Sequence, residues 1–413
     1  MGTRYRAFRH RNFTLLWTGL VFSNIGTWMQ FVAQGWLVVT LTKSPGWLGV
    51  VALAGALPFL VLPLIAGVIA DYIDRVKLLK MTQTASMLLA FVLAILTITD
   101  LVNLWEIIAL AFLTGTANSF DNPTRAALVP DLVPREDLMQ AISLNSTAFQ
   151  GAALIGPAIA GVLVGVIGVG GCFMINGFSY LAVIVALFLL RIEEPVRTTA
   201  IALRRELVAG ARFVLSTPVL LNLLLLTVAF SLFGRSYTTL LPAFAKLVLN
   251  KDSSDLGFMY AMPGLGTLIG GFGLATYGNV RDKGRFLLII SVAYGVAMVC
   301  FSLSSQLWLI LAILIVVGAC NTAFSATANT MLQTRAPGPM RGRVMSYNTI
   351  ALIGLTPLGG AIVGGIAEAA GTRAALVTAG LVVAACAILI YSLLPYLRAA
   401  KYEEQALLQE VAS

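Results

Sequence analysis

Long apolar stretches, separated by short polar segments, recur along almost the whole chain of 413 residues. Most are long enough for a helix to cross the hydrocarbon core of a bilayer, which takes roughly 20 residues. A helix pairs all of its backbone groups internally, so it crosses lipid without needing a closed barrel. The pattern predicts an all-α membrane protein with twelve transmembrane helices. These spans are expected at residues 12–40, 46–70, 79–99, 105–124, 138–166, 172–190, 219–247, 255–279, 286–304, 307–330, 344–366 and 373–395.

The composition agrees with a membrane protein and argues against a soluble one. Hydrophobic residues make up 59% of the chain and charged residues only 11%, whereas a soluble domain carries about 25% charged residues. A net charge of +9 would suggest nucleic acid as the partner of a soluble protein. In a membrane protein the same excess is expected from basic residues retained on the cytoplasmic side, so no nucleic-acid partner is predicted.

The basic residues alternate between the two sides of the predicted membrane. The N-terminus, every second loop and the C-terminal tail hold 22 of the 27 Lys and Arg residues. Both termini are therefore expected in the cytoplasm. The apolar run from Phe13 to Val39 is too long for a signal peptide, so it is predicted to be a retained first span.

Residues 191–218 form the longest loop and place several arginines between apolar residues such as Leu203 and Leu207. This pattern predicts a cytoplasmic linker with an interfacial amphipathic helix. The linker would divide the chain into an N-terminal six-helix bundle at 1–190, a C-terminal six-helix bundle at 219–395, and a cytoplasmic tail at 396–413.

The two predicted bundles resemble each other in sequence, which indicates an internal repeat. Two parallel repeats of six spans would place a substrate cavity at their interface, near the middle of the bilayer. The matching pairs, at shifts of 203 or 208 residues, include Gly115 with Gly318, Asn118 with Asn321, Pro134 with Pro337, Asn145 with Asn348, Gly156 with Gly359, and Asp74 with Asp282.

The loop between the second and third spans carries Gly67, Asp71 and Arg75. It resembles the signature loop of the major facilitator superfamily, although Tyr72 and Asp74 depart from that pattern. A carboxylate such as Asp71 at a helix end can pair with Arg75 and face the positive N-terminus of a neighbouring helix. The resemblance implies a latch that holds one conformation closed on the cytoplasmic side. The alternative is a basic loop that only sets the topology.

Asp121 and Arg125 lie one helical turn apart near the end of the fourth span. Asp121 could carry a proton, but the resemblance to the superfamily favours a role in the latch beside Asp71 and Arg75. The fifth span contains Gly156, Pro157 and Gly161, which are similar to the Gly-Pro motif of antiporters in the superfamily. Ordinary packing of small residues is the alternative explanation of that motif.

Taken together, these motifs resemble the exporter group that contains the enterobactin exporter and the bacterial macrolide and multidrug efflux proteins. The resemblance implies a secondary transporter that exports small molecules. One position departs from the pattern: many drug:proton antiporters have an arginine four residues before a glycine of span four, and here Ala111 precedes Gly115. The standard route of proton coupling is therefore left open.

Charged residues inside a span are costly and are functional candidates by default. Arg235 lies well inside span seven. It could bind an anionic or catecholate group or a carboxylate such as Glu106, or it could pair with helix-end carbonyls. Glu106, near the outer end of span four, is the remaining proton-site candidate, and simple solvation is its alternative.

Polar and aromatic side chains recur in the spans expected to line the cavity, and this mixture suits amphipathic ligands. Each could equally hold two helices together. The predicted cavity residues are Asn24, Trp28, Gln34, Asn145, Gln150, Arg235, Tyr237, Asn321, Phe324 and Asn348.

The chain lacks a G-x-x-x-x-G-K-(S/T) loop, so ATP is not expected as the direct energy source. Its sequence contains no His or Cys cluster, so no metal, no cofactor and no enzymatic activity are predicted. We expect a monomeric exporter of drug-like or siderophore-like molecules that works by alternating access, with protons as the counter-ion. A lipid or lysolipid flippase is the alternative of the same fold, and a non-transporting receptor or scaffold is the alternative of another class.

Overall fold

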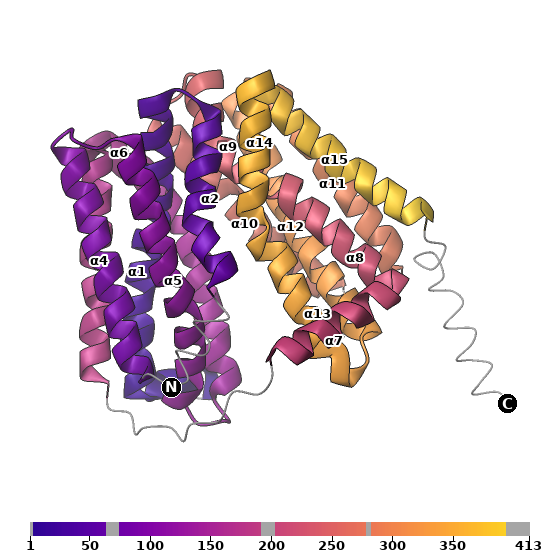
Figure 1. Cartoon of the computed structure of the whole chain (residues 1–413), viewed down its shortest axis with the longest axis horizontal. Helices are drawn as coiled ribbons and strands as arrows, with labels where there is room; N and C mark the ends of the chain where they lie inside the picture. Colours follow the sequence, from indigo (N-terminus) through magenta and orange to yellow (C-terminus); the bar gives the residue numbers. More distant parts are fainter. Residues whose placement is uncertain (1–2, 63–73, 191–202, 278–281, 394–413) are drawn as a thin grey trace. The chain divides into compact units, whose positions relative to one another are not determined.

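The computed structural model describes residues 3–62, 74–190, 203–277 and 282–393, and the regular elements within these ranges are all helices (Figure 1). The all-α membrane fold predicted from the sequence is confirmed. The chain forms two compact units. The first unit is Met1–Ile201 with Leu241–Ala261, and the second unit is Ala202–Leu240 with Met262–Ser413. The predicted division into bundles at 1–190 and 219–395 stays a prediction.

The first unit is built on one long helix. Helix α6 packs along α1 and also along α4, while α2 packs on α5. Gly168 breaks α6 with a positive φ of 74°, a conformation that glycine adopts without strain. This break separates the predicted fifth and sixth spans. The elements are η1 (Thr3–Arg9), α1 (Arg11–Thr42), α2 (Pro45–Val61), α4 (Arg75–Ile98), α5 (Leu104–Leu132) and α6 (Leu138–Leu189).

The second half of the chain contains shorter helices joined by π-helical turns. Such turns insert an extra residue into a helix and often occur at functional sites. Helix α11 packs on α12 and α15 within the second unit. The elements are α7 (Leu203–Ser216), α8 (Pro218–Ala229), η2 (Phe230–Gly234), α9 (Tyr237–Ala243), η3 (Phe244–Val248), α10 (Ser253–Tyr277), α11 (Lys283–Leu303), α12 (Leu307–Arg335), α13 (Gly338–Thr349), η4 (Ile350–Gly354), α14 (Thr356–Ala370) and α15 (Thr372–Leu393).

Eight helical stretches in the described residues are long and apolar enough to cross a membrane. One of them is α6, which covers two predicted spans, and the remaining predicted spans correspond to α1, α2 and α5. Helix α5 continues to Leu132, past the predicted end at residue 124. Hydropathy detects only the apolar part of a helix, and the predicted end falls within the polar stretch where Asp121 and Arg125 pair one turn apart.

Helix α7 lies within the predicted linker. A Cβ added to Gly210 of α7 would lie 3.0 Å from Arg343 Cβ and 3.2 Å from a ring carbon of Tyr347. Both residues belong to α13, so α7 packs directly on that helix of the second unit.

The internal repeat predicted from the sequence reappears in the helix caps. Asp74 caps α4 by accepting a hydrogen bond from the Lys77 N–H at 2.6 Å. Asp282, its counterpart at a shift of 208 residues, caps α11 by accepting from the Arg285 N–H at 2.9 Å. An acidic N-cap satisfies an unpaired helix donor and interacts favourably with the helix dipole.

The repeat also reappears where helices cross. A Cβ added to Gly115 would lie 1.9 Å from the carbonyl oxygen of Gly55, where α5 crosses α2. A Cβ added to Gly318 would lie 2.0 Å from the carbonyl oxygen of Pro263, where α12 crosses α10. In both units a glycine therefore allows the same backbone contact, as is common in membrane helices.

We expect Gly318→Ala to destabilise the protein, because α12 and α10 must separate to accommodate the new methyl group. The cost should be about 1–3 kcal/mol, the usual range for overpacking. Gly365→Ala in α14 is the matched control, since a Cβ there meets nothing within 4 Å. Thermal unfolding in detergent measures both variants. Equal melting temperatures for the two would contradict the crossing described here.

Candidate functional site

Two polar clusters join α4 to α5 in the first unit. In one, Arg75 Nη1 donates to Asp131 Oδ2 at 2.7 Å and to the carbonyl oxygen of Ala127 at 3.0 Å. The side chains of Arg75 and Asp131 are 30% and 22% exposed. The pair therefore lies at a partly solvated surface, where an ion pair adds little to stability but fixes a geometry.

The second cluster surrounds Asp121, which is 1% exposed. Its Oδ1 accepts hydrogen bonds from Thr82 Oγ1 at 2.9 Å and from Gln83 Nε2 at 2.7 Å. Its Oδ2 accepts from Arg125 Nη2, one turn further along α5. The buried carboxylate is thus compensated by a cation and by two neutral donors from the neighbouring helix.

The sequence predicted a single latch containing Gly67, Asp71, Arg75, Asp121 and Arg125. The structure brings Asp121 and Arg125 together but places Arg75 in the other cluster. Gly67 and Asp71 lie outside the described residues.

Sequence reasoning missed three residues of these clusters. Asp131 carried a detectable signal, since it is an acid on the polar continuation of α5. Thr82 and Gln83 carried none, because isolated polar residues in a span are as often simple helix contacts.

Glu106 forms a capping box at the start of α5. Its carboxylate accepts from the Asn103 N–H at 3.0 Å, and Asn103 Oδ1 accepts from the Glu106 N–H at 3.1 Å. This reciprocal pair satisfies two helix donors and accounts locally for an acid at this position.

The Gly-Pro motif of α6 forms two close helix contacts within the first unit. A Cβ on Gly156 would lie 2.7 Å from Trp28 Cβ on α1. A Cβ on Gly161 would lie 2.9 Å from the Cα of Gly257 on α10. Ser253 Oγ also donates to the carbonyl oxygen of Gly161 at 3.0 Å. We call the contact of Gly161 with Ser253 and Gly257 the glycine seam.

The predicted cavity residues of the first unit keep some accessible surface. Asn24, Gln34 and Asn145 are half-buried, and Gln150 is exposed. Trp28 makes edge-on contacts with Phe31 and Phe149, with ring centroids 5.8 Å and 6.0 Å away. These side chains are accessible to a ligand, and their role as ligand contacts stays a prediction.

The aromatic cavity candidates of the second unit are buried. Phe324 is stacked on Phe230, with ring centroids 3.9 Å apart and planes 6° from parallel. Tyr237 is 6% exposed and contacts Phe301 edge-on. In this structure both side chains pack against other aromatic rings, and ligand contact by either stays a prediction.

The two predicted asparagines of this unit have unsatisfied acceptors. Asn348 Nδ2 donates to Asn329 Oδ1 at 2.6 Å. The Oδ1 atoms of Asn348 and Asn321 are buried and have no donor among the described residues. Buried acceptors of this kind are rare and favour a polar partner.

Arg235 follows the π-helix η2, and its own N–H donates to the carbonyl oxygen of Phe230 at 2.9 Å. Its side chain is half-buried. Within the described residues the guanidinium forms no hydrogen bond and no ion pair, with neither a carboxylate nor a helix-end carbonyl. The hydroxyl of Tyr294 donates to the carbonyl oxygen of Gly234, the residue directly before Arg235.

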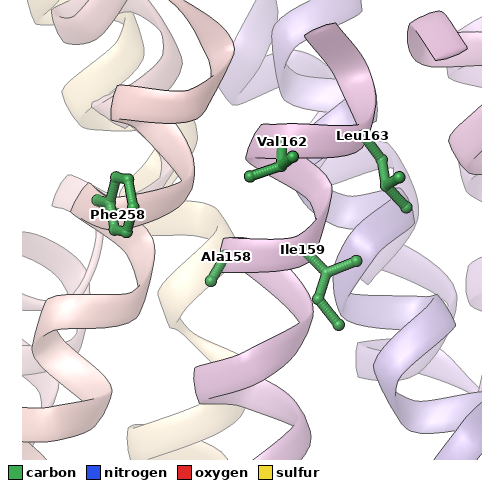
Figure 2. Close-up of a pocket in the computed structure, with 5 residues that line it drawn as sticks. All are labelled: Ala158, Ile159, Val162, Leu163 and Phe258. Carbon is green, nitrogen blue, oxygen red and sulfur yellow. The ribbon is translucent and has the colours of Figure 1, made fainter. Parts of the chain in front are cut away.

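A shallow pocket of about 380 Å³ lies between α6 and α10 in the first unit. Figure 2 shows Phe258 of α10 on one side and apolar side chains of α6 on the other. The lining is entirely apolar and includes none of the predicted cavity residues. It consists of Ala158, Ile159, Val162, Leu163 and Phe258.

The family model described as a transmembrane secretion effector matches residues 2–411. The chain belongs to this family. It is thus a transporter of the major facilitator superfamily, not an enzyme, and the resemblance inferred from the Gly67–Arg75 loop and the Gly-Pro span is confirmed.

Individual relatives of this secretion effector agree with the family assignment. This chain is 29% identical over 359 residues to the multidrug efflux pump Tap of Mycolicibacterium fortuitum, and the alignment covers 84% of this chain and 87% of that protein. It is 26% identical over 317 residues to the enterobactin exporter EntS of Shigella boydii, covering 76% and 75%.

The fold of the secretion effector is also found in a solved transporter. The inward-facing, unoccupied structure of a bacterial homologue of the human lysosomal transporter Spinster superimposes with a TM-score of 0.74. The alignment covers 95% of this chain and 97% of that one, at 14% identity. This likeness establishes the fold, and with the apolar helices it makes the secretion effector a multi-pass membrane protein.

Proposed function

We propose that this secretion effector exports small amphipathic molecules, drug-like or siderophore-like, by alternating access. The observation that most supports alternating access is the glycine seam. At Gly161 and Gly257 two backbones touch without intervening side chains, and Ser253 adds a hydrogen bond to the Gly161 carbonyl. Such a contact brings two helices close together but is held by few side-chain interactions. The helices can therefore separate and re-form the contact in each transport cycle. The relatives with efflux and export functions support the outward direction.

We propose further that the two polar clusters of α4 and α5 form the latch at the cytoplasmic end. The Arg75–Asp131 pair is partly exposed and exchanges easily with water. The Asp121–Arg125 cluster is buried and holds the helix pair in one arrangement. Both termini would be cytoplasmic, as the distribution of basic residues predicts, and the transporter would act as a monomer in the bacterial inner membrane.

Export is proposed to be driven by protons moving inward, with Asp121 and Glu106 as the candidate proton sites. Asp121 is buried between α4 and α5 and accepts hydrogen bonds from Thr82 and Gln83. Glu106 lies in the partly exposed capping box at the start of α5. The absence of an arginine at Ala111 makes these acids the alternatives to the standard coupling route.

The proton gradient is tested with the purified protein in liposomes. We impose a proton gradient that drives protons toward the side of the membrane occupied by the cytoplasmic face of the transporter. This gradient should accelerate export of an amphipathic dye at least several-fold over the rate with no gradient. An ionophore that collapses the gradient should remove the acceleration. An unchanged rate after collapse would contradict antiport. Movement of a fluorescent lysolipid in place of the dye would favour the flippase.

A further inference from the structure

The second half of this chain places Arg235 well inside a span, and the helices around it supply few acids that could neutralise it. Residues 219–251 contain no Asp or Glu, and neither do residues 283–367. Glu368 follows only at the end of α14, where it is exposed. A charge inside a membrane protein is normally paired, because an unpaired one is costly to keep. The other acids between residues 219 and 368, Asp252, Asp255 and Asp282, lie at or just before helix starts, and none forms an ion pair with Arg235 among the described residues. The counter-charge of Arg235 is therefore left to a bound group.

The surroundings of Arg235 hold its backbone in place. Tyr294 packs on Phe230 with ring centroids 4.6 Å apart. Its hydroxyl donates to the carbonyl oxygen of Gly234 at 2.5 Å, directly before Arg235. Phe230 in turn stacks on Phe324. The π-helix and these rings fix the start of the arginine side chain, and fixed geometry reduces the entropy lost when a ligand binds.

The guanidinium itself is available for binding. Its donors have no partner among the described residues, and none of them is fully buried. Buried side-chain atoms without a partner are confined, in the described part of the chain, to Gln83 Oε1, Asn321 Oδ1 and Asn348 Oδ1. A guanidinium has five N–H donors in a planar fork, which matches the two oxygens of a carboxylate, a catecholate or a phosphate.

We propose that the exported molecule carries an anionic group and that Arg235 binds this group. The inference rests on the proposed export function and narrows it. Among amphipathic molecules it selects organic anions and disfavours cationic drugs, because a bound cation would meet Arg235 with no acid nearby to offset the repulsion. The Phe230, Tyr294 and Phe324 rings form a buried apolar cluster that packs on the turn directly before Arg235. A charge-assisted hydrogen bond is stronger beside such an apolar region than in water.

Transport into liposomes containing the full-length protein tests the charge preference with a matched pair of probes. The acid is dansyl-leucine, and the neutral analogue is its methyl ester, with empty liposomes correcting for leakage. We expect the wild-type protein to move the acid roughly tenfold faster than the ester, in line with one charge-assisted hydrogen bond. Arg235→Gln should abolish the preference, and Arg235→Lys should keep part of it because the charge remains.

Arg373→Gln is the control. Its guanidinium donates to the Ser302 and Leu303 carbonyl oxygens at 2.9 Å, a helix-end role unrelated to substrate. We expect this variant to keep the tenfold preference. Because the wild-type ratio already tests the inference, an Arg235 variant that fails to fold leaves the test intact. A fluorescent lysophosphatidylglycerol forms the second arm, and its Arg235-dependent movement would assign the anion to a lipid phosphate.

The outcomes separate the two proposals. Equal wild-type rates for acid and ester, with the ester moving faster than leakage, would overturn the anion inference and leave export standing. A preference that survives in Arg235→Gln would overturn the role of Arg235. Movement of none of the three probes above leakage would overturn the export proposal and the anion inference with it.

Discussion

Replacing Asp121 with asparagine should reduce the transport rate at least about tenfold, the largest effect we expect from a single charge. The carboxylate is 1% exposed and compensates Arg125, whose side chain is only 18% exposed. An asparagine amide would leave that arginine without its counter-charge. Breaking a buried ion pair in this way typically costs about 3–5 kcal/mol. The measurement is the initial transport rate per folded protein, together with the melting temperature in detergent.

Asp131→Asn is the matched control for Asp121→Asn, because it removes the acid of the other cluster on the same two helices. Its pair with Arg75 is partly exposed, so the stability loss should stay below about 1 kcal/mol. A melting temperature that falls equally in both variants would contradict the different burial of the two pairs.

The double variant Asp121→Asn with Arg125→Gln separates stability from mechanism. Removing both charges eliminates the uncompensated cation, so the melting temperature should recover. If the cluster is part of the latch, transport should stay slow in this variant. Recovery of the rate along with the stability would assign Asp121 a purely structural role.

The fold was predictable because lipid imposes a simple rule on the sequence. Each helix that crosses the membrane must be apolar over a fixed length, and hydropathy detects this directly. The rule does not determine where a helix ends in water. Helix α5 therefore continues to Leu132, past the apolar window, through a segment held by side-chain pairs. The break at Gly168 was predictable as a loop but not as a single residue with positive φ.

The site was predictable only where partners are close in sequence. Asp121 and Arg125 are one turn apart, and the structure pairs them. Arg75 and Asp131 are 56 residues apart and on different helices, so their pairing depends on how α4 and α5 are aligned. No local pattern contains that alignment. The same holds for Thr82 and Gln83, whose role follows from facing a buried carboxylate.

The aromatic candidates show a related limit. A phenylalanine at a polar stretch of a span has the same sequence signal whether it lines a cavity or fills the core. Phe324 is stacked on Phe230 and completely buried. Arg235 differs, because its charge makes burial costly and the sequence alone therefore marks it as a functional candidate. That it has no acidic partner among the described residues follows only from the structure.

Gly161→Ala should slow transport strongly, and Gly165→Ala should leave the rate nearly unchanged. Both substitutions add the same methyl group to α6, one turn apart. At Gly161 the methyl would lie 2.8 Å from the carbonyl oxygen of Ser253 and 2.9 Å from Gly257 Cα, so the backbones must separate. At Gly165 the nearest atom is Ser253 Oγ at 3.8 Å, an ordinary contact. Initial rates in liposomes with an imposed proton gradient measure the difference.

The effect of Gly161→Ala should come from a seam that no longer closes, and not from a loss of folding. Separating α6 from α10 also weakens the hydrogen bond from Ser253 Oγ to the Gly161 carbonyl, which is 3.0 Å long. In a background with the four native cysteines replaced, a seam held open should admit a membrane-impermeant thiol reagent to a cysteine placed at Ser254, whose Oγ lies 3.4 Å from the Gly161 carbonyl oxygen. The seam of the Gly165→Ala variant should exclude the reagent. Equal labelling and equal rates in the two variants would show that the seam does not open and close during transport. In that case the glycines would serve only to pack the helices.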